Sequence, residues 1–600
     1  MKVGLEIHAQ LDTKKLFCNC DTELKDDPVR KVRRKLHATV SELDEVDRAA
    51  FEESLKNKEH IYEAFDDSCL VYLDEEPPHK VNEKALEIAL KTALLLKALI
   101  ADQIYFMRKI VIDGSNVSGF QRTALIALDG VIETEEGTVE VPTICLEEDA
   151  ARRDGAEKNK IFWKIDRLGT PLVEIATAPT ITSPEQGREV ALQIGNILKA
   201  TKKLKGGIGT IRQDVNISIE GGSRIEIKGV QELNMIPEYI KEEVKRQKNL
   251  LKLKKELQKR NAGTDGDYDV TDLFRDTHCK IIKRAESVFV LKLKNFSGLL
   301  GKEIQKERRF GSELADYARK YVSGLFHSDE LPGYGITEKE KVAVLNRLGT
   351  DSFVLVASTE KKARNALKEA EKRIEIAFNG VPEETRKPLE NGTSAYARPL
   401  PGEARMYPET DVPPYIVQKK TIKELKKTLP ELPKKKKERL MEEYGINEEN
   451  AKKIMDYNPD FFERIIREYA VKPTLFLKTA ETQRSLGSDD LNELEIIFEY
   501  LSRHKLVKEG IETVLEEFYK GNKDIEGIIE THDLTPLSNE YAEETIKKIV
   551  RENIGTIEEK GKKAVSALMG ECMKELRGKV DGQKVNELLL KEIKKIENNK

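Results

Sequence analysis

Residues 2–11 place a carboxylate and an imidazole side by side on one side of an expected strand. Apolar side chains alternate there with polar ones, and Glu6 and His8 fall on the polar side. Several divalent cations accept this pair of ligand types. The ordinary alternative is a structural or solvated pair. The residues of the remaining strands are needed to distinguish the two interpretations.

Residues 206–229, GGIGTIRQDVNISIEGGSRIEIKG, predict a β-hairpin with a Gly-Gly turn. One side of the hairpin is apolar. The other side carries Arg212, Asp214, Asn216, Glu226 and Lys228. Asp and Asn form strands poorly, so their position in mid-strand needs a reason. That reason is either a solvated outer face with cross-strand ion pairs or a floor for phosphates and a divalent cation.

Carboxylates also gather in two further expected strands. Glu147, Glu148 and Asp149 are consecutive, and like charges this close are unfavourable unless an arginine or a cation such as Mg²⁺ compensates them. Glu174 lies between apolar neighbours in an expected strand and needs a partner. If the sheet curves, these polar faces converge, which favours a site for a metal and an anion.

The 600 residues are too many for one hydrophobic core and predict about three to five domains. Lys and Arg (103) nearly balance Asp and Glu (107), so the net charge of −4 conceals local asymmetry. Residues 419–439 are strongly basic, which suits either a solvated face or an anionic partner such as nucleic acid.

Six irregularly spaced cysteines argue against a disulfide framework and for a reducing compartment. Cys18 and Cys20, with Cys69 and His79, could hold zinc, although buried thiols are the alternative. The N-terminus lacks the apolar core of a secretory signal, and no apolar run is long enough to span a bilayer. We therefore expect a cytoplasmic protein without a membrane partner.

Helical and strand periods divide the rest of the chain. Apolar spacing predicts a helix over residues 83–97, and a capping-box-like start at Ser183 predicts another that runs to about residue 202. Strands are expected at 287–293 and 352–358, and helices at 313–322 and 360–378. The chain after residue 422 is expected to be helical, punctuated by Pro430, Pro433 and Pro473.

Several stretches resemble the B/E family of tRNA-dependent amidotransferases. They occur in order along nearly the whole chain: KVGLEIHAQL, LEEDAARR, DRLGTPLVEI, GTIRQDVNIS and IEIKG. A later segment, with NFSGLLGKEI and GLFHSDELPGYGI, is similar to the insertion domain of bacterial-type aspartyl-tRNA synthetases. That insertion favours the archaeal E branch of the family over the bacterial B branch.

The resemblance implies an α+β multidomain fold. A curved antiparallel-sheet cradle with helices would span residues 1–262 and 387–420, interrupted by an inserted α/β domain over 263–386. An all-α helical domain (421–533) and a helical tail domain (534–600) that binds tRNA would follow. Basic tail residues compatible with phosphate contacts are Lys562, Lys563, Lys574, Arg577 and Lys579.

The resemblance also implies an activity, the ATP-dependent conversion of Glu-tRNA(Gln) to Gln-tRNA(Gln). ATP would phosphorylate the γ-carboxylate of the attached glutamate, and ammonia would then displace phosphate. Bringing two anions together requires Mg²⁺ and positive side chains. By family motif, the catalytic residues would be Glu6, His8, Glu148 and Glu174. The metal ligands would be Glu6, His8, Glu148 and Glu226, and the nucleotide and phosphate contacts Arg212, Asp214, Asn216 and Lys228.

Partners follow from the same resemblance. The chain shows no Ser or Cys nucleophile with an oriented base, so ammonia would come from an asparaginase-like D subunit through an enclosed channel. The expected assembly is a heterotetramer of two D and two E subunits. Bacterial B subunits pair the Cys-x-Cys with a later Cys-x-x-Cys, and only Cys69 stands near that place here. The alternatives are a non-catalytic tRNA-binding scaffold and an ATP-dependent ligase acting on a free carboxylate.

Overall fold

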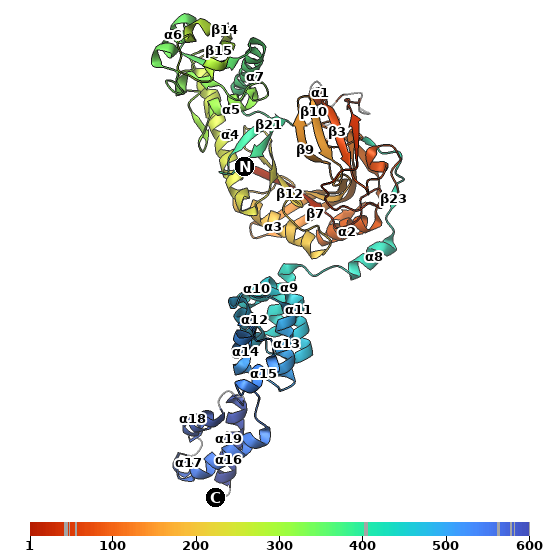
Figure 1. Cartoon of the computed structure of the whole chain (residues 1–600), viewed down its shortest axis with the longest axis vertical. Helices are drawn as coiled ribbons and strands as arrows, with labels where there is room; N and C mark the ends of the chain where they lie inside the picture. Colours follow the sequence, from red (N-terminus) through yellow and green to blue (C-terminus); the bar gives the residue numbers. More distant parts are fainter. Residues whose placement is uncertain are drawn as a thin grey trace. The chain divides into compact units, whose positions relative to one another are not determined.

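The computed structural model describes residues 1–600 except 41–45, 47, 55, 56, 401–405, 561–563, 577, 578, 581, 599 and 600. It has two compact units, Met1–Pro430 and Glu431–Lys600. Figure 1 shows mixed helices and sheets in the first unit and helices in the second. The predicted α+β multidomain architecture is confirmed at this level. Within the described ranges, every helix is too short or too polar to span a lipid bilayer.

One large sheet organises the first unit. Its neighbouring strands are antiparallel, except that β13 and β20 run parallel. The strands in spatial order are β21 (Ser394–Pro399), β20 (Glu384–Pro388), β13 (Ile225–Val230), β12 (Ile211–Ser218), β1 (Lys2–Gln10), β11 (Pro171–Ala176), β8 (Gly137–Glu148), β7 (Phe120–Thr134), β6 (Phe106–Ile110) and β22 (Met406–Pro408), with β4 (Leu99–Ile100) on β7.

Three helices pack against this sheet: α2 (Glu83–Leu95), α3 (Pro184–Ala200) and α4 (Ile236–Lys259). The apolar residues of β1 are buried, and these helices bury their own apolar residues over the same core. The predicted helix start at Ser183 is confirmed, because its hydroxyl accepts the N–H of Gln186 at 3.0 Å. The expected hairpin of β12 and β13 is also present, with Gly221 at φ 72° in its turn.

A second, four-stranded sheet in the first unit escaped the sequence analysis. Its order is β2 (Arg30–Arg34), β3 (Glu59–Ala64), β10 (Lys160–Lys164) and β9 (Arg152–Glu157). These strands are short and rich in charge, so their period is hard to read in the sequence. Strands β3 and β10 run parallel, whereas the outer pairs are antiparallel.

Residues 263–379 form a smaller sheet with its own hydrophobic core. The strands are β14 (Gly263–Asp269), β15 (Ser287–Lys294), β19 (Ser352–Ser358) and β18 (Phe326–His327). The predicted strands at 287–293 and 352–358 are confirmed. Helices α5 (Phe310–Ala318), α6 (Glu338–Leu348) and α7 (Glu360–Asn379) accompany them. Helix α5 begins three residues before its predicted start and ends four residues before its predicted end, and α7 ends one residue beyond its prediction.

The second unit is helical, as predicted. Pro433 and Pro473 each open a helix, where their missing N–H costs no hydrogen bond. The helices are α9 (Pro433–Tyr444), α10 (Glu448–Tyr457), α11 (Pro459–Tyr469), α12 (Pro473–Ser485), α13 (Leu491–Ser502), α14 (Ile511–Tyr519), α15 (Ile525–Thr531), α16 (Asn539–Glu552), α17 (Ile554–Lys560), α18 (Ala564–Leu576) and α19 (Gly582–Asn598). The last four surround a core of their own.

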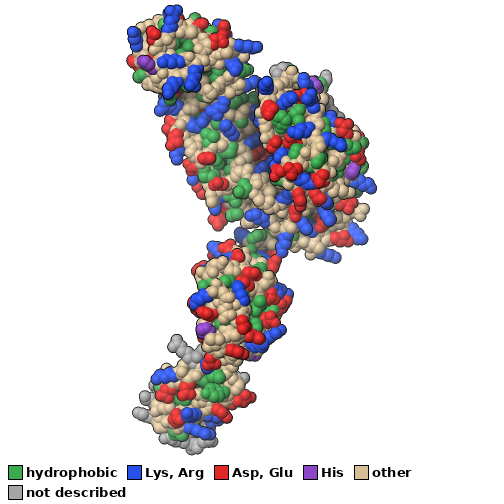
Figure 2. Space-filling view, viewed as in Figure 1, with side chains coloured by type: hydrophobic (Ala, Val, Ile, Leu, Met, Phe, Trp, Pro, Cys, Tyr) green, Lys and Arg blue, Asp and Glu red, His purple; other side chains and the backbone are tan. Residues whose placement is uncertain are grey.

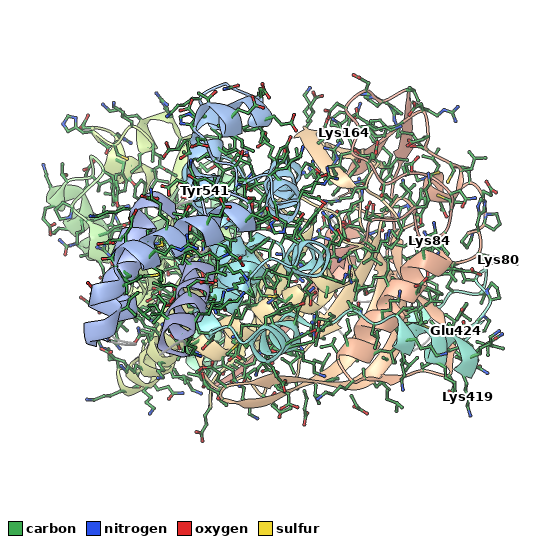
Figure 3. All side chains as sticks on the ribbon, turned by 90° about the horizontal axis from the view of Figure 1, so that it is seen from below. Lys80, Lys84, Lys164, Lys419, Glu424 and Tyr541 are labelled. Atoms are coloured by element: carbon green, nitrogen blue, oxygen red, sulfur yellow. The ribbon has the colours of Figure 1, made fainter. Side chains whose placement is uncertain are left out.

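The basic run at 419–439 falls on α8 (Lys419–Lys427) in the first unit and on α9 in the second. Figure 3 shows Lys419 of α8 at the edge of the molecule, and α8 packs against α2. In α9, Lys437 pairs with Glu448 at 3.1 Å. Part of the run is therefore neutralised within the chain. Of the basic tail residues, Lys562, Lys563 and Arg577 lie outside the described residues.

Candidate active site

Strand β1 presents Glu6 and His8 on the side of the sheet opposite its buried apolar residues. The antiparallel register places His8 between Glu174 of β11 and Arg212 of β12. It places Glu6 beside Asp214 of β12. Side chains in register point to the same face, so three neighbouring strands contribute to one polar row. The predicted convergence of polar strand faces is therefore present.

The imidazole of His8 is the centre of this row. Its Nε2 lies 3.2 Å from Glu174 Oε2 and 3.5 Å from Glu6 Oε1. Burial opposes the charge on His8, but Glu174, Glu147 and Glu6 outweigh it and raise the pKa of His8 to about 9. Burial, followed by the negative charge of Glu174, raises the pKa of Glu6 to about 7. Negative charge is thus crowded around a single imidazole.

Glu147, rather than Glu148, completes the group around His8. Glu147 accepts a hydrogen bond from Lys109 Nζ at 2.7 Å, and its ligand oxygen lies within 4.8 Å of those of His8 and Glu174. Glu148 is the next residue along β8 and faces the other side, where it accepts the backbone N–H of Arg122 at 3.1 Å. Successive side chains of a strand point to opposite faces, so Glu148 faces away from His8 when Glu147 faces it. The expected grouping of Glu148 with His8 is therefore corrected, and Glu147 takes that place.

The hairpin adds a second cluster to the same face. Lys228 Nζ lies 2.7 Å from Asp214 Oδ2 and 2.9 Å from Glu226 Oε1. The β12–β13 register shifts next to Asp214, which lets its second oxygen accept the N–H of Gly229 at 2.8 Å. Asn216 lies opposite Glu226, and its buried Oδ1 has no hydrogen-bond partner among the described residues. That oxygen is available to a ligand.

Arg212 lies at the far end of the row. Its guanidinium donates to Asp149 Oδ1 at 2.9 Å, and Gln10 donates to Asp149 Oδ2 at 2.6 Å. Asp149 is buried, and a buried carboxylate needs hydrogen-bond donors. Arg212 and Gln10 supply one donor to each of its two oxygens. Arg212 is therefore tied to the loop after β8 as well as to its own strand.

The donor set around His8 fits a hard divalent cation. Two groups offer three ligand atoms within 4.8 Å of one another: Glu6, His8 and Asp214, and His8, Glu147 and Glu174. Oxygen ligands in excess over one imidazole suit Mg²⁺, which also keeps waters and phosphate oxygens in its shell. The surplus of carboxylates over nearby cations gives such an ion a favourable electrostatic environment.

Comparison with known proteins decides the family. A family model described as the GatB/GatE catalytic domain matches residues 1–423, and a second, described as the GatB domain, matches residues 460–593. The chain belongs to the GatB/GatE family. The first match contains every residue of the polar row described above. The second covers most of the helical unit.

Curated relatives of this GatB/GatE chain match it almost from end to end. A protein of Methanocaldococcus jannaschii is 49% identical over 99% of both chains, and one of Thermococcus sibiricus is 48% identical over 99% of this chain and 98% of its own. A Pyrococcus furiosus relative is 49% identical over 95% of this chain and 94% of its own. Each carries the name of the E subunit of glutamyl-tRNA(Gln) amidotransferase.

Sequence reasoning did not place Lys109 or Asp149 among the site residues of this GatB/GatE chain, although it named Asp149 as one of three consecutive acids that need a cation or an arginine. Lys109 pairs with Glu147, and its Nζ lies 3.8 Å from Glu174. Asp149 holds Arg212. The alternation of residues 106–110 could have indicated that Lys109 faces the sheet's polar side. The three consecutive acids contain Glu147, but no local signal says which of them faces His8.

The sulfur atoms of Cys18, Cys20 and Cys69 lie within 4.8 Å of one another. The structure thus brings together three of the four side chains considered for zinc. His79 contacts Glu76 instead, at 3.0 Å. Zinc and buried free thiols stay the two alternative interpretations of these three side chains.

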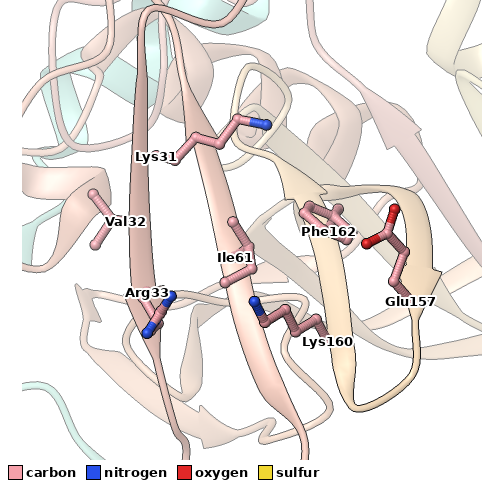
Figure 4. A pocket seen from close by; sticks show the side chains of 7 residues that line it. All are labelled: Lys31, Val32, Arg33, Ile61, Glu157, Lys160 and Phe162. Atoms are coloured by element: carbon pink, nitrogen blue, oxygen red, sulfur yellow. The ribbon is translucent and has the colours of Figure 1, made fainter.

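A separate cavity of about 290 Å³ lies on the small four-stranded sheet (Figure 4), and its lining includes no residue of the polar row. Two of its cations already pair with carboxylates: Lys31 with Glu63 at 2.7 Å and Arg33 with Glu59 at 3.2 Å. We assign it no role in the reaction. Its lining residues are Lys31, Val32, Arg33, Ile61, Glu157, Lys160 and Phe162.

Proposed function

We propose that this chain converts Glu-tRNA(Gln) to Gln-tRNA(Gln) at the expense of ATP. The observation that carries the proposal is the row of carboxylates, imidazole and lysines across β1, β6, β8, β11, β12 and β13, within a chain of the GatB/GatE family. The name shared by the near full-length relatives gives the substrate.

The chemistry requires activation of a carboxylate. Ammonia does not displace oxide from a carboxylate at a useful rate, whereas phosphate is a good leaving group. The γ-carboxylate of the tRNA-bound glutamate therefore attacks the γ-phosphoryl group of ATP, and ammonia then attacks the resulting acyl phosphate. The first step unites two anions, so its transition state needs nearby positive charge.

Glu6, His8, Glu147 and Glu174 are the residues that would hold Mg²⁺. Bound there, the ion would neutralise phosphate charge during transfer. Glu226 is proposed to act indirectly: it pairs with Lys228 and does not ligate the ion. Glu148 faces the opposite side of the sheet and is proposed to orient Arg122 instead of ligating the metal.

Lysines of the row bind the phosphates. Lys109 and Lys228 approach the carboxylate cluster from opposite sides, from β6 and β13. Asn216 offers its unpartnered oxygen to the nucleotide or to the glutamyl group. Arg212 pairs with Asp149, and Asp214 accepts a hydrogen bond from Lys228. These two contacts are proposed to orient the side chains that bind the phosphates.

Ammonia is proposed to come from a partner. In the described part of the chain, three of the six thiols gather in one cluster and no thiol is paired with a histidine base. An asparaginase-like D subunit is therefore proposed to hydrolyse glutamine, in a heterotetramer of two D and two E subunits. An enclosed path between the subunits would keep ammonia unprotonated and protect the acyl phosphate from water.

The remaining domains are proposed to hold tRNA. The boundaries proposed are 1–262 with 387–420 for the cradle, 263–386 for an insertion similar to that of bacterial-type aspartyl-tRNA synthetases, 421–533 for the helical domain and 534–600 for the tail. The separate cores of residues 263–379 and of the last four helices support this division.

One experiment tests the function. The full chain is mixed with Glu-tRNA(Gln), ATP, Mg²⁺ and ammonium chloride, and formation of ADP and Gln-tRNA(Gln) is measured with and without a chelator. We expect both products, and their loss on chelation. Binding of tRNA without ADP formation would favour a scaffold. Equal amidation of free glutamate would favour a ligase acting on a small carboxylate.

A further inference from the structure

Strand β20 borders the hairpin of the polar row and joins it to the inserted segment. It pairs in parallel with β13, with Thr385 in register with Glu226. The Thr385 hydroxyl donates to Glu226 Oε2 at 3.1 Å, and both side chains are buried. The other oxygen of Glu226 contacts Lys228 at 2.9 Å. The hydrogen bond from Thr385 occupies Oε2 of Glu226, so Oε1 is the oxygen that pairs with Lys228.

The residues on either side of Thr385 belong to a buried ion network. Glu384 accepts hydrogen bonds from Arg246 of α4 at 2.8 Å and from the Tyr317 hydroxyl of α5 at 2.5 Å. Arg386 pairs with Glu384 and lies 3.2 Å from Glu313 of α5. These side chains are almost completely buried, apart from Tyr317, which is partly buried.

Such a network holds β20 rigidly. Buried charges need several partners with good geometry, so they tolerate few alternative arrangements. Helices α5 and α7 supply Glu313 and Arg373 to it, and two guanidinium nitrogens of Arg373 donate to Glu313 Oε2, at 2.5 and 3.0 Å. The inserted segment is thereby tied to the strand that carries Thr385.

We propose that Thr385 is a positioning residue for ATP: anchored by the buried ion network of α4, α5 and α7, its hydroxyl holds Glu226 so that Lys228 stays directed at Asp214 and the phosphate site. Without the hydroxyl, Glu226 loses a donor in a buried position and turns both oxygens toward Lys228. Lys228 then moves away from Asp214. This inference rests on the proposed function of the row.

The test compares Thr385→Val, which keeps the shape and removes the hydroxyl, with Thr385→Ser, which keeps the hydroxyl. Thr393→Val is the matched control, because Thr393 is equally buried but its hydroxyl bonds to Asn391 at 2.6 Å, outside the row. Full-length proteins are assayed with Glu-tRNA(Gln) and ammonium chloride. ATP–Mg²⁺ binding is measured by calorimetry, which needs no turnover.

For Thr385→Val we expect the KM and Kd for ATP to rise about tenfold, the scale of one hydrogen bond to a charged group. The KM for Glu-tRNA(Gln) should stay within about twofold, because the effect acts only on the phosphate site. Thr385→Ser and Thr393→Val should match the wild type. Unchanged ATP parameters in Thr385→Val, or an equal rise in Thr393→Val, would overturn the proposal. Absence of turnover in the wild type would instead reject the proposed function.

Discussion

At the scale of single residues, the site depends on which side of a strand each carboxylate faces. Glu147 and Glu148 are chemically identical neighbours, yet one lies with His8 and Lys109 and the other with Arg122. The alternation of β8 alone separates their roles. Burial, followed by the negative charge of Glu174, raises the pKa of Glu6 to about 7, and a bound cation would oppose this shift.

Substitution of these two neighbours separates the metal site from its support. Glu147→Gln should raise the Mg²⁺ concentration for half-maximal phosphorylation about tenfold or more, since it removes a proposed ligand. Glu148→Gln should leave that concentration unchanged, because its side chain faces away from His8. Magnesium titrations of ADP formation provide the measurement. The assignment fails if the two variants exchange these behaviours.

At the scale of elements, buried polar contacts fix how strands and helices meet. In the small sheet, Trp163 of β10 donates to His60 Nδ1 of β3 at 3.1 Å. Between the large sheet and the inserted segment, Glu313 of α5 holds Arg246 and Arg373, and all three side chains are completely buried. In each case, loss of one partner leaves a buried polar group unsatisfied.

Burial lowers the pKa of His60 below its ordinary value near 6.5. The folded state therefore keeps His60 neutral, while the unfolded chain takes up a proton below about pH 6.5. Stability is present above that pH and declines as the pH falls through it. We expect His60→Gln to reduce the loss of stability between pH 7.5 and 5.5.

Trp163 is the chain's single tryptophan, so its fluorescence reports unfolding of this sheet directly. Urea transitions at the two pH values give the comparison, with His504→Gln on the exposed surface of the second unit as the control. An equal pH effect in His60→Gln and in the wild type would exclude His60 as the titrating group.

Removal of Glu313 should destabilise the first unit strongly. Glu313→Ala leaves buried arginines without their partner, which costs about 3–5 kcal/mol in unfolding free energy. The matched control is Glu360→Ala, since Glu360 pairs with Arg364 at 2.9 Å on the exposed face of α7. Water screens that exposed pair, so its loss should change the unfolding free energy far less than the loss of Glu313. Denaturant unfolding curves give the unfolding free energies of the two variants. Equal values would contradict a stabilising role for the buried ion network.

Much of this could be predicted from the sequence, because strand period and cap chemistry are local. The hairpin, the polar face of β1 and the cap at Ser183 are read from a few adjacent residues. The four-stranded sheet could not be read, because its strands are short and charged and β3 pairs with β10 about 100 positions away. Partnerships such as Thr385 with Glu226 depend on register across the fold, which no local pattern contains.

At the scale of the whole molecule, the large sheet with the polar row and the last four helices lie in different compact units. Figure 2 shows acidic and basic side chains interspersed over the visible face of both units. The last four helices bury a core of their own, centred on residues such as Ile546, Leu568 and Leu589. We therefore expect chemistry and tRNA affinity to be separable.

A chain ending at Thr535 tests this separation. It retains Leu534, whose side chain packs on the preceding helical core. The truncated protein should bind tRNA about tenfold more weakly or worse, because phosphate contacts are lost. At saturating tRNA its kcat should change little. Filter binding and turnover assays measure the two quantities, and an unchanged Kd for tRNA would remove the tail from the binding surface.

The most direct measurement follows oxygen from the glutamyl group. Glu-tRNA(Gln) labelled with ¹⁸O in the γ-carboxylate is incubated with the full chain, ATP, Mg²⁺ and ammonium chloride, and the phosphate released is analysed by mass spectrometry. Attack of the carboxylate on ATP predicts one ¹⁸O atom in phosphate for every amide formed. Amide formation with unlabelled phosphate would contradict the acyl-phosphate route and the role given to the polar row.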